Sequence, residues 1–203
     1  MKFQLSQTGR QIQKENDLIR GGGAAYKVQA SLIVAGLGFA ILPSNAAFVA
    51  TEYYSFGDSL TDSGNVALAG GPAYPSGRFS DGPTWAEYLS NDHLGLGAHQ
   101  PSAAGGNNHA WGGAWTDSGG VVPTVLQQVG GFIANGGSFQ STSLVSIWAG
   151  ANDFFGTVAN PGGPMNPGVS VNNIGTTIDL LVGAGAQHIL VLNLPDFGFA
   201  PDF

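Results

Sequence analysis

The stretch FGDSLTDSGN, residues 56–65, follows directly on the hydrophobic run Phe48–Phe56. A run of this length and composition predicts a β-strand, so Ser59 would lie just beyond the strand's carboxyl end. Active sites of open α/β sheets gather at that end. Because Gly57 has no side chain, Ser59 can expose its hydroxyl and its backbone N–H in the same space, which suits a nucleophile. The alternative is a turn in which Ser59 or Asp58 caps the next helix.

The rest of the chain alternates short apolar runs with helical patterns, as βαβ units with a parallel sheet do. The predicted fold class is therefore α/β, with three layers. The last strand is apolar enough to be buried on both faces. The expected strands are Phe48–Phe56, a short one around His109–Trp111, Ser143–Ala149 and Ile189–Leu194; the expected helices run from Pro83 to Leu89 with Trp85, Tyr88 and Leu89 on one face, over the stripe Val125, Leu126, Val129, Phe132 and Ile133, and over the stripe Ile174, Ile178, Leu181 and Val182.

Two further motifs occur downstream. AWGGA, residues 110–114, places Gly113 54 residues after Ser59, and WAGAND, residues 148–153, ends the third predicted strand. Taken singly, the first motif is typical of a flexible turn and the second of an Asx turn with a helix cap. Their order and spacing relative to Ser59 add weight to a shared site.

Together, these three stretches resemble the motif blocks of the GDSL, or SGNH, hydrolase family, and most of all its secreted phospholipase, lecithinase and hemolysin-like group. The resemblance implies that Ser59 is the nucleophile. It also implies an oxyanion hole formed by the N–H groups of Ser59 and Gly113, with Gly112 as the alternative, and by the side-chain amide of Asn152. The implied reaction is hydrolysis of a carboxylic or lipid ester through a serine acyl-enzyme.

The acidic residues of these motifs are expected to be structural. A carboxylate beside a forming oxyanion would repel it, so Asp153 is expected to form an Asx turn and cap a helix, and Asp58 and Asp62 are likewise expected to be structural. A later stretch, LNLPDFGFAP at residues 192–201, resembles the strand and loop that follow the third block in the same family. It supports membership without adding a catalytic residue.

The family's general base is missing from the sequence. Members supply a histidine and a supporting aspartate from a D-x-x-H block near the C-terminus, and no such block occurs among the 203 residues. None of the four histidines is expected to replace it, because two lie in a loop rich in Gly and Ser and two begin strands. We therefore expect residues 47–203 to be a C-terminally truncated hydrolase domain that lacks its last strand and helix and has little activity in this form. The histidines are His93, His99, His109 and His188.

Residues 1–46 have the layout of a signal peptide. Five of the six basic residues precede the apolar run Ala30–Leu42, and the small residues Ser44 and Ala46 form a cleavage site near Ala47. The segment is therefore expected to be a signal peptide or N-terminal leader, and the protein to be secreted, periplasmic or on the cell surface. An uncleaved anchor is less favoured, because only about 13 residues are densely apolar and a spanning helix needs about 20.

Composition and charge exclude several classes of partner. The chain has no cysteine, and its histidines lack ligand spacing, so no metal site is expected. Neither a phosphate loop nor a dinucleotide fingerprint occurs, so no cofactor is expected. Residues 47–203 contain one basic residue, Arg78, and eleven acidic residues, which gives a net charge of about −10. Such a charge disfavours nucleic acid as a partner. The partner that remains is a small-molecule or lipid ester substrate, for which a membrane or lipid surface is one source.

The competing hypothesis for the function is a non-catalytic secreted α/β binding domain that kept the motifs.

Overall fold

The computed structural model describes residues 48–73, 75–117, 121–154 and 166–196. All of them belong to one of the two units into which the chain divides, Ala46–Phe203. The expected leader, residues 1–46, and the end of the stretch 192–201 lie outside the described residues. Within those residues, no helix has the length and apolar character needed to cross a membrane.

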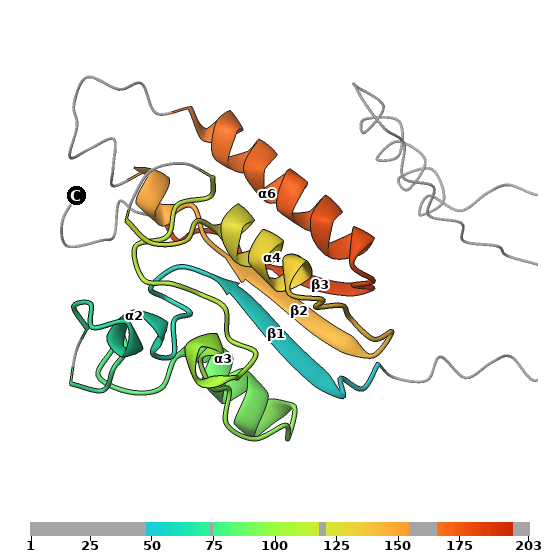
Figure 1. Cartoon of the computed structure of the whole chain (residues 1–203), viewed down its shortest axis with the longest axis horizontal. Coiled ribbons are helices and arrows are strands. Elements are labelled where there is room, and N and C mark those ends of the chain that lie inside the picture. The colour runs from blue at the N-terminus through green and yellow to red at the C-terminus, as the bar shows by residue number, and fades with distance from the viewer. Residues whose placement is uncertain (1–47, 74, 118–120, 155–165, 197–203) are drawn as a thin grey trace, which may run out of the picture. The chain divides into compact units, whose positions relative to one another are not determined.

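A parallel sheet of three strands lies at the centre of the described fold. The strands β1 (Glu52–Gly57), β2 (Ser143–Trp148) and β3 (His188–Val191) lie in the order β1-β2-β3 (Figure 1). Gly57 pairs with Trp148, so β1 and β2 end side by side at the carboxyl edge of the sheet. The predicted α/β class with a parallel sheet is confirmed.

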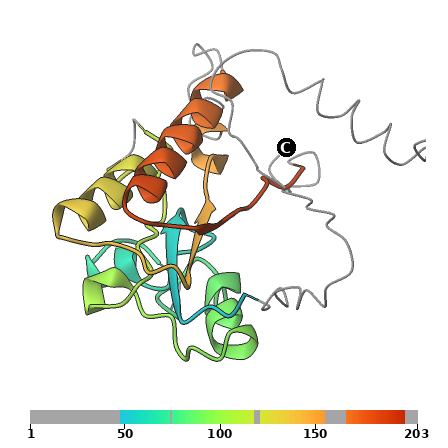
Figure 2. The ribbon, with the colours of Figure 1, turned by 90° about the vertical axis from the view of Figure 1, so that its right-hand side faces the viewer.

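Helices cover both faces of this sheet, as two views at right angles show (Figures 1 and 2). On one face lie α4 (Val125–Ala134) and α6 (Pro167–Gly183), and on the other α2 (Asn65–Leu68) and α3 (Trp85–Tyr88). After α3 the chain continues as the π-helix η1 (Leu89–His93) and then the 3-10 helix η2 (Ser102–Ala104). The three predicted layers are therefore present.

The apolar core lies between the sheet and the pair α4 and α6. Strand residues alternate between faces, and one face of β1 and β2 supplies large apolar side chains that meet the helices. Each such side chain contributes roughly 1.5–3 kcal/mol when fully buried. The fully buried members are Phe56, Val125, Val129, Val145, Ile147 and Leu181.

The opposite face of the sheet is built from polar pairs. The hydroxyl groups of Tyr53 and Ser146 are 2.7 Å apart, and Ser55 Oγ lies 2.8 Å from Nε2 of His99. The His99 ring also stacks on Tyr53 with ring centroids 4.4 Å apart. Burial lowers the pKa of His99 to about 4, so this histidine is neutral in the folded protein at neutral pH.

The predicted strand around His109–Trp111 was wrong as a regular strand. The segment runs parallel to β1, since the N–H groups of His109 and Trp111 donate to the carbonyls of Ser55 and Gly57 at 2.7 and 3.1 Å. It forms only isolated bridges, because the N–H of Gly57, which would continue the ladder to the carbonyl of His109, donates to Gln128 Oε1 at 3.0 Å instead.

The last described strand is not buried on both faces, contrary to the prediction. β3 spans four residues and pairs with β2, and within the described part of the chain it has no second neighbour. Leu190 and Val191 are therefore 40% and 43% exposed.

The helix expected from Pro83 to Leu89 begins two residues late. Thr84 is its N-cap, in a reciprocal capping box with Glu87, so Pro83 precedes the cap. Ala86 faces the core and Tyr88 is exposed. In α6 likewise, Val182 is exposed, while Thr177 and Leu181 are buried.

Candidate active site

The turn after β1 carries Ser59 above the carboxyl edge of the sheet. Gly57 passes so close to β2 that a Cβ there would lie 2.2 Å from the carbonyl oxygen of Trp148. The next N–H, of Asp58, donates to that same oxygen at 3.2 Å. The carbonyl of Asp58 then accepts the N–H groups of Thr61 and Asp62, each at 3.0 Å, which closes a single helical turn. The sequence places a glycine where no side chain fits.

Ser59 lies within this turn and is partly exposed. Throughout the described part of the chain, neither its hydroxyl nor its backbone N–H has a hydrogen-bond partner. Both groups are therefore available to a substrate, as the nucleophile assignment requires.

Asp58, beside Ser59, is buried. Its Oδ1 accepts the N–H of Leu60 at 3.0 Å, whereas Oδ2 has no partner among the described residues. Burial raises the pKa of Asp58 to about 7; the bond from Leu60 opposes this rise, and the charge of Asp153 adds to it. Asp58 thus shapes the turn through its backbone and Oδ1, in keeping with a structural residue.

The second motif forms a tight turn against β1. The N–H of Ala114 donates to the carbonyl of Trp111 at 3.0 Å, and Gly113 has a φ of 81°, as a type II turn requires. The N–H of Gly112 donates to Oδ2 of Asp62 at 2.9 Å. No described residue accepts the N–H of Gly113. Of the two alternatives in the sequence, Gly113 therefore has the uncommitted donor.

Asn152 is brought against this glycine turn. It lies in a helical turn directly after Gly150, and its Nδ2 donates to the carbonyl of Ala114 at 2.9 Å. One N–H of the amide is used in this way, and the amide has a second. The three predicted site residues therefore come from segments that are hydrogen-bonded to one another at the carboxyl edge of β1 and β2.

Asp153, the next residue, anchors other parts of the chain. Its carboxylate accepts Thr116 Oγ1 at 2.5 Å, the Thr116 N–H at 3.1 Å and Ser170 Oγ at 2.9 Å. Asn173 in turn donates to Thr116 Oγ1 at 2.9 Å. The carboxylate ties the loop after the glycine turn to the start of α6, so it is structural, although through tertiary contacts instead of the expected helix cap.

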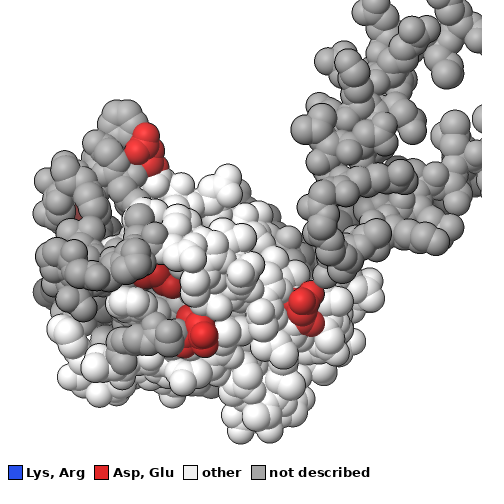
Figure 3. Space-filling view, turned by 90° about the horizontal axis from the view of Figure 1, so that it is seen from above, with Lys and Arg blue, Asp and Glu red and all other residues white. Residues whose placement is uncertain are grey.

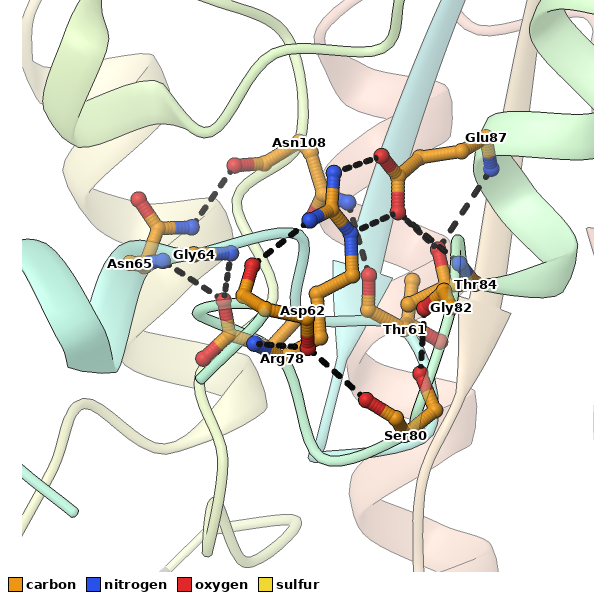
Figure 4. A network of polar contacts seen from close by, with 11 residues as sticks. Thr61, Asp62, Gly64, Asn65, Arg78, Ser80, Gly82, Thr84, Glu87 and Asn108 are labelled. Carbon is orange, nitrogen blue, oxygen red and sulfur yellow. Dashed lines mark hydrogen bonds and ion pairs between the residues drawn. The ribbon is translucent and has the colours of Figure 1, made fainter. Parts of the chain in front are cut away.

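A buried polar network fixes the two loops relative to each other (Figure 4). Asp62 accepts three N–H groups at the start of α2, from Gly64, Asn65 and Val66, besides that of Gly112. Its position supports the expected structural role.

Two asparagines complete the network. Asn65 Nδ2 donates to the carbonyls of Asn108 and Ala110, each at 2.8 Å, and Asn108 Nδ2 donates to the carbonyl of Thr61 at 2.7 Å. Sequence reasoning missed both roles. Their presence within and beside the motifs was the signal that could have found them.

An ion pair flanks this network (Figure 4). Arg78 binds both carboxylate oxygens of Glu87, with Nε 2.7 Å from Oε2. Burial raises the pKa of Glu87, but hydrogen bonds from Arg78 and Thr84 outweigh it and hold the pKa below its usual value. Because Glu87 also caps α3, the pair fastens residue 78 to that helix.

None of the four histidines, all of which the structure describes, is hydrogen-bonded to Ser59. His99 pairs with Ser55, and His109 stacks on Phe56 with ring centroids 5.0 Å apart. His188 stacks on Phe48 at the amino end of β3, and His93 is an exposed residue of η1. Burial lowers the pKa of His109 to about 4. A general base for Ser59 is therefore not found among them.

An apolar hollow of about 250 Å³ lies at the same edge of the sheet, beyond Asn152. The ends of β2 and β3 form its floor, and α6 its wall. Among the described residues, no group of His, Asp or Glu side chains could hold a metal ion. The lining includes Ala149, Gly150, Phe154, Ile174, Val191 and Leu194.

Comparisons with known proteins agree with this geometry. The chain is 33% identical over 153 residues to a phosphatidylcholine-sterol acyltransferase of Aeromonas hydrophila. The aligned region covers 72% of the chain and 45% of that protein. It is 29% identical over 159 residues to the secreted effector protein SseJ of Salmonella typhimurium, covering 74% of the chain and 36% of that protein. An uncharacterized Pseudomonas putida protein from the trpE-trpG intergenic region is 28% identical over 199 residues, 80% of the chain and 32% of that protein.

The chain spans less than half the length of each of these relatives. The sequence profile of one family, described as GDSL-like Lipase/Acylhydrolase, matches residues 53–203. This match begins in β1 and takes in the Ser59 turn, the glycine turn and the Asn152 turn. The chain therefore belongs to the GDSL-like lipase/acylhydrolase family.

Proposed function

We propose that this protein hydrolyses carboxylic or lipid esters through an acyl-enzyme on Ser59. One observation carries the proposal: Ser59 and Gly113 both have N–H groups that no described residue accepts, in loops that hydrogen bonds hold together at one edge of the sheet. In the proposed reaction, Ser59 Oγ attacks the ester carbonyl. A general base takes the proton of Ser59, and the N–H groups of Ser59 and Gly113 and the second N–H of the Asn152 amide receive the oxyanion. The tetrahedral intermediate then breaks its bond to the alcohol oxygen, the alcohol leaves with that proton, and water hydrolyses the acyl-enzyme to the carboxylic acid and free Ser59.

The surroundings of the site favour an uncharged or zwitterionic ester with an apolar acyl group. Arg78 is the only Lys or Arg among the described residues, and Glu87 already neutralises it. On the face seen in Figure 3, the described residues that are visible include separated acidic side chains and no Lys or Arg. The hollow beside β2 and β3 offers an apolar acyl group a dry surface. The name of the Aeromonas relative, a phosphatidylcholine-sterol acyltransferase, supports a lipid ester as substrate.

The general base must come from outside the described histidines. A serine hydroxyl is a weak nucleophile until a base accepts its proton. Because the chain spans less than half the length of each relative, we propose that a histidine of a longer protein supplies it; the 203-residue chain would then have weak activity, and the complete gene product would be the active species. Export through residues 1–46 belongs to the same proposal and would place the enzyme among extracellular lipids.

The test compares hydrolysis of p-nitrophenyl butyrate by the 203-residue chain and by the complete gene product, each also carrying Ser59→Ala. Ser63→Ala is a matched control, because Ser63 is in the same motif and its buried hydroxyl has no hydrogen-bond partner in the described structure. We expect the complete product to be active, Ser59→Ala to lower kcat by at least about 10³-fold, and Ser63→Ala to leave kcat within about twofold.

A second candidate is a non-catalytic binding domain, favoured by the absence of any histidine against Ser59. A folded complete product that is inert towards esters and is not labelled at Ser59 by a fluorophosphonate would establish this alternative. Equal activity of the Ser59→Ala variant and the wild type would remove Ser59 from the mechanism.

A further inference from the structure

Gln128 has no part in the reaction proposed above, yet its side chain contacts the end of β1. It lies in the first turn of α4 and is 5% exposed. The N–H of Gly57 donates to Gln128 Oε1 at 3.0 Å, and Gln128 Nε2 donates to the carbonyls of Gly57 at 2.9 Å and Pro123 at 3.1 Å. One side-chain amide thus binds both backbone groups of a single residue.

Those two bonds hold the peptide groups on both sides of Gly57. Glycine lacks the Cβ that restricts other residues, so the direction in which the chain leaves β1 depends on external contacts. The peptide between Gly57 and Asp58 is bound by Gln128 and by the N–H of Trp111. The next peptide carries the N–H of Ser59. A change in the orientation of the peptide between Gly57 and Asp58 therefore also changes the direction of the Ser59 N–H.

We propose that Gln128 is a positioning residue that sets the orientation of the Ser59 turn, and thereby of the nucleophile and its own oxyanion donor. This inference rests on the proposed function. A side-chain amide suits the task, because it offers an acceptor and two donors without a charge. Oxyanion donors act only when they are held within a fraction of an ångström of the productive geometry.

The matched variants are Gln128→Met and Gln127→Met in the complete gene product. Gln127 precedes Gln128 on α4, is exposed, and accepts the N–H of Thr124 in the helix's capping box. Both substitutions remove amide hydrogen bonds from the same helical turn, but only Gln128→Met frees Gly57. We expect Gln128→Met to lower kcat for p-nitrophenyl butyrate by about 10- to 100-fold with KM within about twofold, and Gln127→Met to leave both within about twofold.

A second readout is independent of ester hydrolysis. Two-dimensional NMR of the amides should show the resonances of Asp58 and Ser59 displaced in Gln128→Met and unmoved in Gln127→Met. Unmoved resonances, or an unchanged kcat in a folded and active protein, would overturn the role of Gln128. If the wild type is inert towards esters, the proposed function fails, and the NMR comparison alone still decides whether Gln128 sets the Ser59 turn.

Discussion

At the scale of single residues, the nucleophile turn contains a carboxyl group that the fold disfavours as an anion. Asp58 is 1% exposed, and within the described structure its Oδ2 has no hydrogen-bond partner. Burying an unpaired charge is costly, so the proton stays on the group to higher pH than in water. The pKa of Asp58 is accordingly raised to about 7, mainly by burial. A proton on Asp58 also removes a negative charge beside the proposed oxyanion.

The raised pKa predicts that Asp58 lowers stability as pH rises. The folded protein binds more protons than the unfolded chain between about pH 4, near the ordinary pKa, and about pH 7, so the free energy of unfolding falls across that window. Asp58→Asn keeps an acceptor for Leu60 and cannot ionise. Between pH 4 and pH 8, we expect the free energy of unfolding, measured by urea titration, to fall by on the order of 1–4 kcal/mol more in the wild type than in Asp58→Asn.

Asp92→Asn serves as the control for that series. Asp92 is exposed, so its replacement changes the net charge by the same amount without changing a buried group. If Asp58→Asn and Asp92→Asn shift the pH profile equally, burial is not the cause. Parallel profiles for Asp58→Asn and the wild type would contradict the raised pKa.

At the scale of elements, strand β2 matched its predicted range within one residue. The segment Ser143–Ala149 is rich in apolar residues, contains the β-branched Val145 and Ile147, and is mostly buried. The segment around His109–Trp111 did not form a strand, because the N–H of Gly57 that would continue its pairing with β1 donates to Gln128 instead. Gln128 could not be assigned at all: its partner Gly57 is 71 residues away, and helical periodicity says only that the residue is near the core. The sequence could therefore suggest candidate site residues, but not the contacts that hold them.

One carboxylate, that of Asp62, joins the start of α2 to the glycine turn. The two oxygens of Asp62 accept four backbone N–H groups from both loops, and the residue is fully buried. In Asp62→Asn an NH2 group replaces one oxygen and faces donors, so at least one N–H is left unpaired. We expect a loss of about 2–4 kcal/mol in the free energy of unfolding, measured by urea titration.

Asp81→Asn is the matched control for that loss, because Asp81 is exposed. Its stability should stay within about 0.5 kcal/mol of the wild type. A loss in Asp62→Asn no greater than in Asp81→Asn would mean that the four bonds are replaced by water.

At the scale of the whole molecule, a buried and a partly buried histidine lie on opposite faces of the sheet. Buried His99 pairs with Ser55 on the polar face, and partly buried His109 stacks on Phe56 and meets the edge of Phe132, towards α4. Burial lowers the pKa of each to about 4, from 6.5. The unfolded chain therefore binds more protons than the folded protein between pH 6.5 and 4. These two residues contribute a stability that is complete above pH 6.5 and is lost as pH falls towards 4.

Within this pH window the effect of Asp58 has the opposite sign, because its contribution to the free energy of unfolding rises as pH falls. Because two histidines outweigh one aspartate, we expect the free energy of unfolding to fall on acidification. Each histidine contributes a loss on the order of 1–3 kcal/mol before the opposite effect of Asp58 is subtracted. In the double variant His99→Gln/His109→Gln, we expect lower stability than the wild type at pH 7, since the ring stacking is lost, but a smaller drop from pH 7 to pH 4.5. His93→Gln, at an exposed position, should keep the drop of the wild type. An equal drop in all three proteins would place the acid sensitivity elsewhere, whereas a smaller drop in the double variant alone would assign it to the two imidazole rings that flank β1.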